Sequence, residues 1–286
     1  MTLRIGTRGS ALARAQADLV ARAVGVDAEV RVVRTAGDAS DRPIPELGDG
    51  VFVTAIEDAL RRGEIDVAVH SLKDLPTEER PGLVIAAVPQ REDPRDVLVT
   101  RSRGGIATLP QGALVGTSSP RRDAFLRALR PDVVTRPIRG NVDTRMAKVR
   151  SGEYDATILA LAGLRRLDIA VADEEILDPR ECPPAPGQGA LAVQCRADDE
   201  ETRALLGRLD HAPTRRAVEA ERELLRLLGA SCEIPLGTYA RVDGDRIVLD
   251  AALPRDGRML RAHASGDDPL ALARECAAAL EAGVHA

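Results

Sequence analysis

Short apolar runs alternate with helical patterns through the first two-thirds of this sequence. Ile65–His70 and Ala156–Ala160 have the length and apolar content of buried strands, and amphipathic stretches such as Ser10–Val24 and Phe52–Arg62 separate runs of this kind. The other expected strands of this part are Leu3–Gly6, Glu29–Arg34, Leu83–Val88, Leu114–Gly116, Val133–Ile138 and Leu191–Arg196. Such alternation is typical of α/β proteins. We therefore expect α/β domains with largely parallel sheets.

The sequence indicates two crossings between domains and a change of character near its end. Glu92 to Asp96 has the composition of a crossing segment, and the proline-rich stretch from Cys182 to Gly187 that of a return. We expect residues 1–92 with 190–209 to form one α/β domain and residues 93–189 a second. From residue 212 onward, a helix, three strands with Asp-Gly turns and a final helix predict a smaller α+β domain over 212–286.

Composition excludes several classes of protein. Only four of the 286 residues are aromatic and the net charge is -5, so neither base stacking nor general binding of a phosphate backbone is expected. No apolar run approaches the roughly 20 residues of a membrane helix, and no apolar signal core opens the chain. The four cysteines and four histidines lack metal-ligand spacing. We expect a cytoplasmic protein without a metal site and without a nucleic-acid or membrane partner.

A pair of arginines opens an expected helix. Arg121 and Arg122 follow Gly116-Thr117-Ser118-Ser119-Pro120, in which Ser119 is a good N-cap and Pro120 a good first helical residue. Cations at this end oppose the helix dipole, which an anion bound there would explain. Two solvated surface arginines are the alternative.

Other arginines occupy similar junctions between a strand and a helix. Arg139 and Arg145 follow the run Val133–Ile138, and Arg8 with Ser10 follows the run Leu3–Gly6. Open α/β sheets bind ligands at the carboxyl ends of their strands. Arginines that converge there predict a ligand with several carboxylates or phosphates.

A carboxylate and a thiol lie where they could take part in chemistry. Lys73, one of only two lysines, and Asp74 directly follow the buried run Ile65–His70. Asp74 is either a turn residue or a carboxylate that transfers protons or stabilises a positive intermediate. Cys232 lies in an expected loop after a helix that Gly229 stops, a position open to covalent chemistry, although an inert apolar role is the usual one for a lone cysteine.

In this order, the segments resemble the porphobilinogen deaminase family, as do Ile158–Leu167 and Ala185–Leu191. The resemblance runs from Arg4 to about Ala240. It implies two domains like those of a type II periplasmic binding protein, with a cleft between them, and a smaller α+β domain that carries the cofactor cysteine. It also implies a transferase of porphyrin (tetrapyrrole and heme) biosynthesis, which joins four porphobilinogen molecules head to tail onto a dipyrromethane primer. Ammonia leaves at each addition, and hydrolysis releases hydroxymethylbilane.

The resemblance further assigns residues to roles. Cys232 matches the cysteine that binds the dipyrromethane through a thioether, and Asp74 matches the catalytic carboxylate. Arginines at positions that bind the cofactor or substrate are Arg8, Arg121, Arg122, Arg139, Arg145 and Arg166. Residues at secondary positions are Ser10, Lys73, Thr117, Ser118, Ser119 and Gln188. Each pyrrole ring of porphobilinogen carries an acetate and a propionate, so guanidinium forks suit the growing chain.

Some features of the family cannot be transferred to this sequence. The family has a mobile loop over residues 35–50, but Ala36, Asp49 and Thr54 stand where basic residues are usual. We assign no role to Cys182, Cys195 and Cys276, and we expect a monomer.

Two other functions are alternatives to this one. A non-enzymatic anion receptor, either a solute-binding or an effector-binding protein, would use an arginine-lined cleft but needs neither a reactive cysteine nor a third domain. A phosphate-transferring enzyme would need a glycine-rich loop of the GxxxxGK type, which this sequence lacks.

Overall fold

The computed structural model of the chain describes residues 2–35, 53–78, 80–101, 104–229 and 234–283. The chain forms two compact units, which we call unit 1 (Met1–Glu92 with Ala190–Val218) and unit 2 (Asp93–Gly189 with Glu219–Ala286). The three-domain division expected from the sequence stays a prediction, because residues of its third domain group with those of the second in unit 2.

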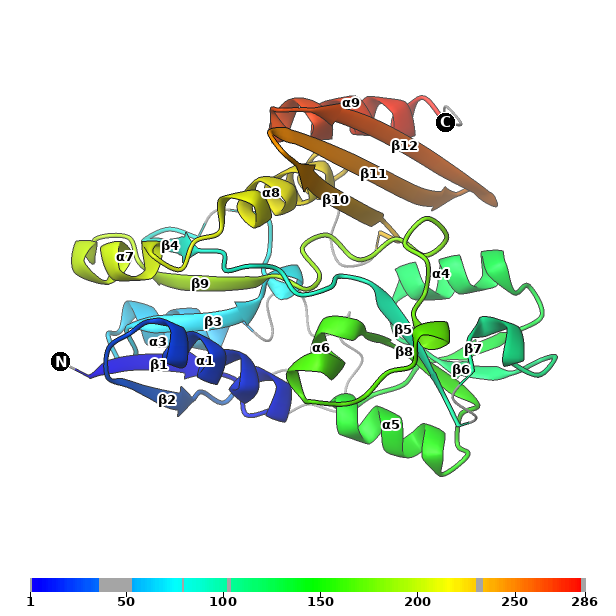
Figure 1. Cartoon of the computed structure of the whole chain (residues 1–286), viewed down its shortest axis with the longest axis horizontal. Helices are drawn as coiled ribbons and strands as arrows, with labels where there is room; N and C mark the ends of the chain where they lie inside the picture. Colours follow the sequence, from blue (N-terminus) through cyan, green and yellow to red (C-terminus); the bar gives the residue numbers. More distant parts are fainter. Residues whose placement is uncertain (1, 36–52, 79, 102–103, 230–233, 284–286) are drawn as a thin grey trace. The chain divides into compact units, whose positions relative to one another are not determined.

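Unit 1 contains a mixed five-stranded sheet (Figure 1). Its strands are β1 (Leu3–Thr7), β2 (Ala28–Val32), β3 (Val67–Ser71), β4 (Leu83–Ala87) and β9 (Leu191–Arg196), in the order β2-β1-β3-β9-β4. Strand β1 runs parallel to β2 and β3, whereas β9 runs antiparallel to β3 and β4. Because β4 is also antiparallel to β9, it runs in the same direction as β1, β2 and β3, and the expectation of a largely parallel sheet fails only at β9. The direction of β9 depends on where the chain re-enters the sheet, which no local pattern encodes.

The helical segments of unit 1 are α1 (Ala11–Ala23), α3 (Thr54–Arg61), the 3-10 turn η2 (Leu72–Asp74) and α7 (Glu200–Gly207). Helix α1 begins at Ser10, whose hydroxyl accepts a hydrogen bond from the backbone N–H of Ala13. Its apolar face buries Ala17 and Val20 in a core shared with β1, β3 and β9. The helix expected over Ser10–Val24 is confirmed to within one residue at each end.

Unit 2 repeats this arrangement in a four-stranded sheet of order β7-β6-β8-β5. The strands are β5 (Asp96–Thr100), β6 (Leu114–Gly116), β7 (Val134–Arg136) and β8 (Ala156–Ala160). The accompanying helical segments are α4 (Pro120–Leu129), α5 (Val142–Arg150), α6 (Leu161–Arg166), η3 (Ile106–Thr108) and η4 (Asp173–Glu175). Strand β6 is parallel to β7 and β8, and β5 is antiparallel to β8. The sequence analysis missed β5, because its first residue is an aspartate in what looked like a crossing segment.

The remainder of unit 2 is an antiparallel sheet covered by a helix (Figure 1). Strands β10 (Gly237–Asp243), β11 (Arg246–Arg255) and β12 (Arg258–Gly266) pair in this order, and α9 (Pro269–Glu281) packs on β11 and β12. The preceding helix α8 (Ala212–Leu227) carries the buried Glu221, which accepts hydrogen bonds from the backbone N–H groups of Gly187 and Ala240 at 2.7 and 2.8 Å. The expected class, α/β with an α+β C-terminal part, is confirmed.

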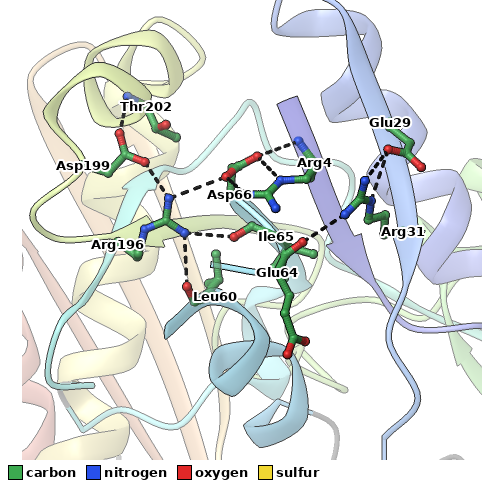
Figure 2. Close-up of polar contacts among 10 residues, drawn as sticks. All are labelled: Arg4, Glu29, Arg31, Leu60, Glu64, Ile65, Asp66, Arg196, Asp199 and Thr202. Carbon is green, nitrogen blue, oxygen red and sulfur yellow. Dashed lines mark hydrogen bonds and ion pairs between the residues drawn. The ribbon is translucent and has the colours of Figure 1, made fainter. Parts of the chain in front are cut away.

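A cluster of charged residues fastens the edge of the unit 1 sheet where β1 and β3 begin (Figure 2). Asp66 accepts hydrogen bonds from the backbone N–H, Nε and Nη2 of Arg4 at 3.0, 2.9 and 2.6 Å. Arg196, the last residue of β9, lies 3.5 Å from Asp66 and donates to the carbonyl oxygens of Leu60 and Ile65. Three strands and the end of α3 are thus joined at the edge opposite the carboxyl ends of β1 and β3.

The cysteines of the described residues are all buried thiols. Cys182, Cys195 and Cys276 are free and at most 1% exposed. Burial raises the pKa of Cys182 and Cys195 to about 11 and that of Cys276 to about 12. These thiols are therefore unreactive at neutral pH.

A helix that crosses a membrane needs about 20 mostly apolar residues. Among the residues that the structure describes, every helix is too short or too polar to cross a membrane.

Candidate functional site

In unit 1, the predicted site residues gather at one edge of the sheet. Arg8 follows β1, and Lys73 and Asp74 follow β3. Because β1 and β3 are parallel neighbours, their carboxyl ends lie at the same edge. The turn that carries Lys73 and Asp74 is held on both sides by Leu72 and Leu75, which are buried in one apolar cluster.

The two side chains of this turn differ in their surroundings. Lys73 is half-buried, whereas Asp74 is exposed. Among the described residues, no ion pair engages the carboxylate of Asp74. A free carboxylate on a fixed turn can approach a bound cation or transfer a proton.

Two buried polar residues of this edge escaped the sequence analysis. Gln16 of α1 is 4% exposed, and its Nε2 donates a hydrogen bond to Oγ of Ser71 at 3.0 Å, which joins α1 to the end of β3. His70 is also buried, and burial lowers its pKa to about 4. Its imidazole is therefore neutral at physiological pH. A polar residue within an otherwise apolar helix face was the only available signal for Gln16.

In unit 2, one buried carboxylate organises the arginine pair. Asp96 is 0% exposed and begins β5 opposite Ala160, the last residue of β8. Its Oδ2 accepts a hydrogen bond from Nη2 of Arg121 at 2.6 Å, and its Oδ1 accepts one from Nη2 of Arg122 at 2.8 Å. Burial acts to raise the pKa of Asp96, but the two guanidinium groups lower it well below its usual range. The carboxylate is therefore ionised throughout the physiological pH range.

This pairing changes the explanation for the arginines at the start of α4. The helix begins as expected, with Ser119 as N-cap and Pro120 at its first position. The two arginines are only 4% and 7% exposed, and Arg121 and Arg122 also donate to the carbonyl oxygens of Pro183 and Ile158. The solvated-surface alternative is wrong. Asp96 supplies an anion from within the chain, which neutralises one of these two positive charges. Their role in ligand binding stays a prediction.

Two further arginines lie in the same region without a carboxylate. No ion pair joins Arg139 or Arg145 to any described acidic residue, and Nη2 of Arg139 is buried without a hydrogen-bond partner. Burial, and then the charges of Arg122 and Arg139, lower the pKa of Arg145 to about 10. Its Nε donates to the carbonyl of Gly140 at 2.8 Å. The four arginines and the one aspartate thus carry a surplus of positive charge.

The hydroxyl groups predicted as secondary contacts all have partners within the chain. Oγ of Ser118 donates to the carbonyl of Ile138 at 2.9 Å and accepts from its N–H at 3.1 Å. Oγ of Ser119 caps α4, and Oγ1 of Thr117 accepts from the N–H of Ser119 at 3.2 Å. Through these hydrogen bonds, the three side chains stabilise the conformation of the loop after β6.

The return segment brings Gln188 to the same carboxylate. Gln188 is buried, and its Nε2 donates to Oδ1 of Asp96 at 2.9 Å and to the carbonyl of Pro94 at 2.6 Å. It stands between Gly187 and Gly189, whose positive φ angles of 74° and 86° favour glycine. Arg166 is attached to this segment as well, since its Nη2 donates to the carbonyl of Gly189 at 2.6 Å.

Several predicted positions lie outside the described residues. Cys232 is among them, as are Ala36 and Asp49 of the loop over residues 35–50, whereas Thr54 is described as the first residue of α3. Among the described residues, no three side chains of histidine, cysteine, aspartate or glutamate are arranged to hold a metal ion.

The donors of unit 2 fit a ligand with several carboxylates. Arg139 and Arg145 carry charges that no described carboxylate neutralises, and a buried guanidinium nitrogen of Arg139 has no acceptor. Burying such groups is costly unless an anion pairs with them. A chain of pyrrole rings that bear acetate and propionate groups would supply these anions.

Family models match both parts of the chain. The model described as "Porphobilinogen deaminase, dipyromethane cofactor binding domain" matches residues 3–204, and that described as "Porphobilinogen deaminase, C-terminal domain" matches residues 215–282. Together they cover most of the sequence.

Relatives named porphobilinogen deaminase are similar over nearly the whole chain. The protein from Acidothermus cellulolyticus is 50% identical, with 97% of this chain and 88% of the relative covered. That from Mycobacterium leprae is 53% identical over 87% of this chain and 81% of the relative. That from Thermus thermophilus is 48% identical over 92% and 89%. These similarities favour the enzyme over the non-enzymatic anion receptor.

Solved structures are similar at a lower level. A lipoprotein of the YaeC family from Enterococcus faecalis has a TM-score of 0.44 and 15% identity, with 73% of this chain and 90% of that chain covered.

Proposed function

The chain belongs to the porphobilinogen deaminase family, and we propose that the two clusters of residues described above carry out different parts of its reaction. The protein is a transferase of tetrapyrrole biosynthesis with hydroxymethylbilane synthase activity. It joins four porphobilinogen molecules head to tail onto a dipyrromethane cofactor, releases ammonia at each addition and then releases hydroxymethylbilane by hydrolysis.

In this proposal, the arginines of unit 2 bind carboxylates of the cofactor and of the growing chain. The observation that carries this assignment is the surplus of positive charge around Arg139 and Arg145. When bound, the dipyrromethane supplies the pyrrole end to which the first porphobilinogen is joined. Guanidinium groups are suited to this role because they remain charged and bind carboxylates with two parallel hydrogen bonds. Arg8, which follows β1 in unit 1, and Arg166, the last residue of α6 in unit 2, are assigned as further carboxylate-binding arginines.

Asp74 is assigned the catalytic role. Positive charge develops on the substrate when ammonia leaves its aminomethyl carbon, and then on the pyrrole ring that attacks this carbon. A preorganised carboxylate stabilises both charges and can take up the proton that the ring loses afterwards. This assignment is supported by the exposed carboxylate of Asp74, which forms no ion pair with any described residue and lies on a turn whose flanking Leu72 and Leu75 are buried.

Cys232 is assigned as the attachment point of the cofactor through a thioether. The three described cysteines support this choice by elimination, because their thiols are buried and their pKa values are raised by burial. A thioether survives turnover while the far end of the chain is elongated.

The mass of the intact protein tests the attachment. We expect wild-type protein to exceed the mass calculated from its sequence by two deaminated porphobilinogen units, and Cys232→Ala to lack this excess. A Cys276→Ala variant serves as control and should retain it. The assignment is wrong if the excess persists in Cys232→Ala.

Turnover of Asp74→Asn tests the catalytic assignment. We expect this variant to retain the cofactor mass but to lose at least about a hundredfold in kcat, the scale of a lost general acid–base group. Asp58→Asn is the matched control, because the side chain of Asp58 in unit 1 is 46% exposed and, among the described residues, forms an ion pair with Arg61. Full activity in Asp74→Asn would refute the role.

We further propose that the protein is a cytoplasmic monomer. Reduced, buried thiols are compatible with a reducing compartment. Light scattering after size-exclusion chromatography tests the monomeric state.

A further inference from the structure

The buried carboxylate of Asp96 is the point at which three residues predicted to bind the ligand meet. One carboxylate receives three side-chain donors: Nη2 of Arg121, Nη2 of Arg122 and Nε2 of Gln188, at 2.6, 2.8 and 2.9 Å. These donors come from the start of α4 and from the return segment, whereas Asp96 itself begins β5. All four side chains are buried.

The arrangement holds both guanidinium groups at two points. Each arginine uses Nη2 for Asp96 and Nη1 for a backbone carbonyl, that of Pro183 for Arg121 and that of Ile158 for Arg122. Two anchors at different nitrogens fix both the position and the rotation of a planar guanidinium group. Asp96 therefore determines the direction in which the charge of Arg122 faces.

Arg122 in turn acts on the arginines that have no carboxylate. Its charge is one of those that lower the pKa of Arg145, together with the charge of Arg139. The three arginines thus share one local field, and among the described residues Arg122 alone of the three is paired with an acid. Displacement of Arg122 would change where a carboxylate is best bound among them.

We propose that Asp96 is a positioning residue: it holds Arg121 and Arg122 in the single arrangement that lets the cluster with Arg139 and Arg145 bind ligand carboxylates. This inference rests on the proposed function of the unit 2 arginines. Asp96 itself does not touch the ligand. Being negative, it would by charge alone weaken the binding of anions, so a positioning role and a purely electrostatic role predict opposite effects.

The test compares Asp96→Asn with wild-type enzyme as purified. Intact mass gives the fraction of chains that carry the dipyrromethane, and steady-state kinetics per loaded chain give KM and kcat for porphobilinogen. We expect KM to rise at least about tenfold, as for truncation of one partner of a buried charge pair. We expect kcat to change less than about threefold, because Asp74 is untouched.

A matched control separates positioning from the loss of any acid near α4. Asp132 pairs with Arg130 at 2.8 Å, and Arg130 follows the last residue of α4, at the far end of the helix from Asp96. Asp132→Asn should leave KM and the loaded fraction unchanged. A lower or unchanged KM in Asp96→Asn would overturn the proposal.

If Asp96→Asn does not fold, the positioning role is tested with two other variants: Arg121→Met alone, and Arg121→Met together with Asp96→Asn. Asp96→Asn combined with Arg121→Met removes one charge of each sign, so the double variant keeps the net charge of the wild-type cluster. If Asp96 positions Arg122, KM in the double variant exceeds that of Arg121→Met alone by at least about fivefold, the size of a coupling between neighbouring residues. Equal or lower KM would show that Asp96 acts through charge only. Absence of the cofactor mass and of turnover in wild-type protein would instead refute the proposed function.

Discussion

Asp66 offers a quantitative test of the charged cluster in Figure 2. In Asp66→Asn, one carboxylate oxygen becomes an amide nitrogen that faces the guanidinium group of Arg4. Removal of one partner from a buried ion pair costs about 3–5 kcal/mol. The side chains of Arg4 and Arg196 retain 30% and 23% exposure, whereas that of Asp66 is 1% exposed. Water can therefore solvate the arginines in part, and we reduce the expected loss in free energy of unfolding to about 2 kcal/mol.

The pH dependence of this loss follows from the pKa of Asp66, which hydrogen bonds from Arg4 lower. A carboxyl group whose pKa is lower in the folded state stabilises the fold above its unfolded value of about 3.9. This contribution disappears as the pH falls through the lower, folded value. Asparagine does not titrate, so the difference between wild type and Asp66→Asn should be full near neutral pH and should shrink in acid.

Urea titrations followed by circular dichroism measure the difference at about pH 7 and about pH 3.5, on either side of the unfolded pKa. Glu64→Gln is the control, because Glu64 pairs with Arg62 on the surface, where both side chains are 57% exposed. We expect no measurable change in that variant. Turnover per folded chain should stay normal in Asp66→Asn, because the cluster lies at the sheet edge opposite Asp74. A difference that is equal at both pH values, or a loss of turnover, would refute this reasoning.

Two further predictions concern the site residues and the buried histidine. Arg145→Met should raise KM for porphobilinogen about tenfold, because one charge-assisted contact to a carboxylate is lost. The control Arg127→Met removes an exposed arginine paired with Asp123 and should leave KM unchanged. Equal effects of the two variants in steady-state assays would contradict the assignment. Burial lowers the pKa of His70 to about 4, so the unfolded chain takes up a proton below about pH 6.5 while the folded protein does not. Stability should therefore be full above about pH 6.5 and fall by up to about 3 kcal/mol toward pH 4. A His70→Gln variant should lack this dependence in urea titrations.

Local patterns predicted much of the secondary structure. The strands expected at Leu114–Gly116, Ala156–Ala160 and Leu191–Arg196 have these bounds in the structure. Runs of apolar residues bounded by turn residues are local signals, and so is the capped start of α4 at Ser119. The antiparallel strands β10, β11 and β12 were likewise predicted from their turns.

Signals that depend on distant partners were not available in the sequence. Strand β5 was missed because its aspartate is compatible with a buried strand only when two arginines neutralise it, and these lie 25 and 26 positions further along the chain. The buried Gln16 depends in the same way on Ser71, 55 positions away.

Arg121 and Arg122 show which features depend on the local sequence and which depend on the tertiary structure. The sequence by itself determined that Arg121 and Arg122 begin a helix at the end of a strand, because Ser119 and Pro120 act through their own backbone neighbours. Only the tertiary structure decided that the pair is held by Asp96, whereas Arg139 and Arg145 have no acid beside them among the described residues. The reason is that helix caps form between adjacent residues, whereas a buried charge finds its counter-ion only when separate strands assemble into one sheet.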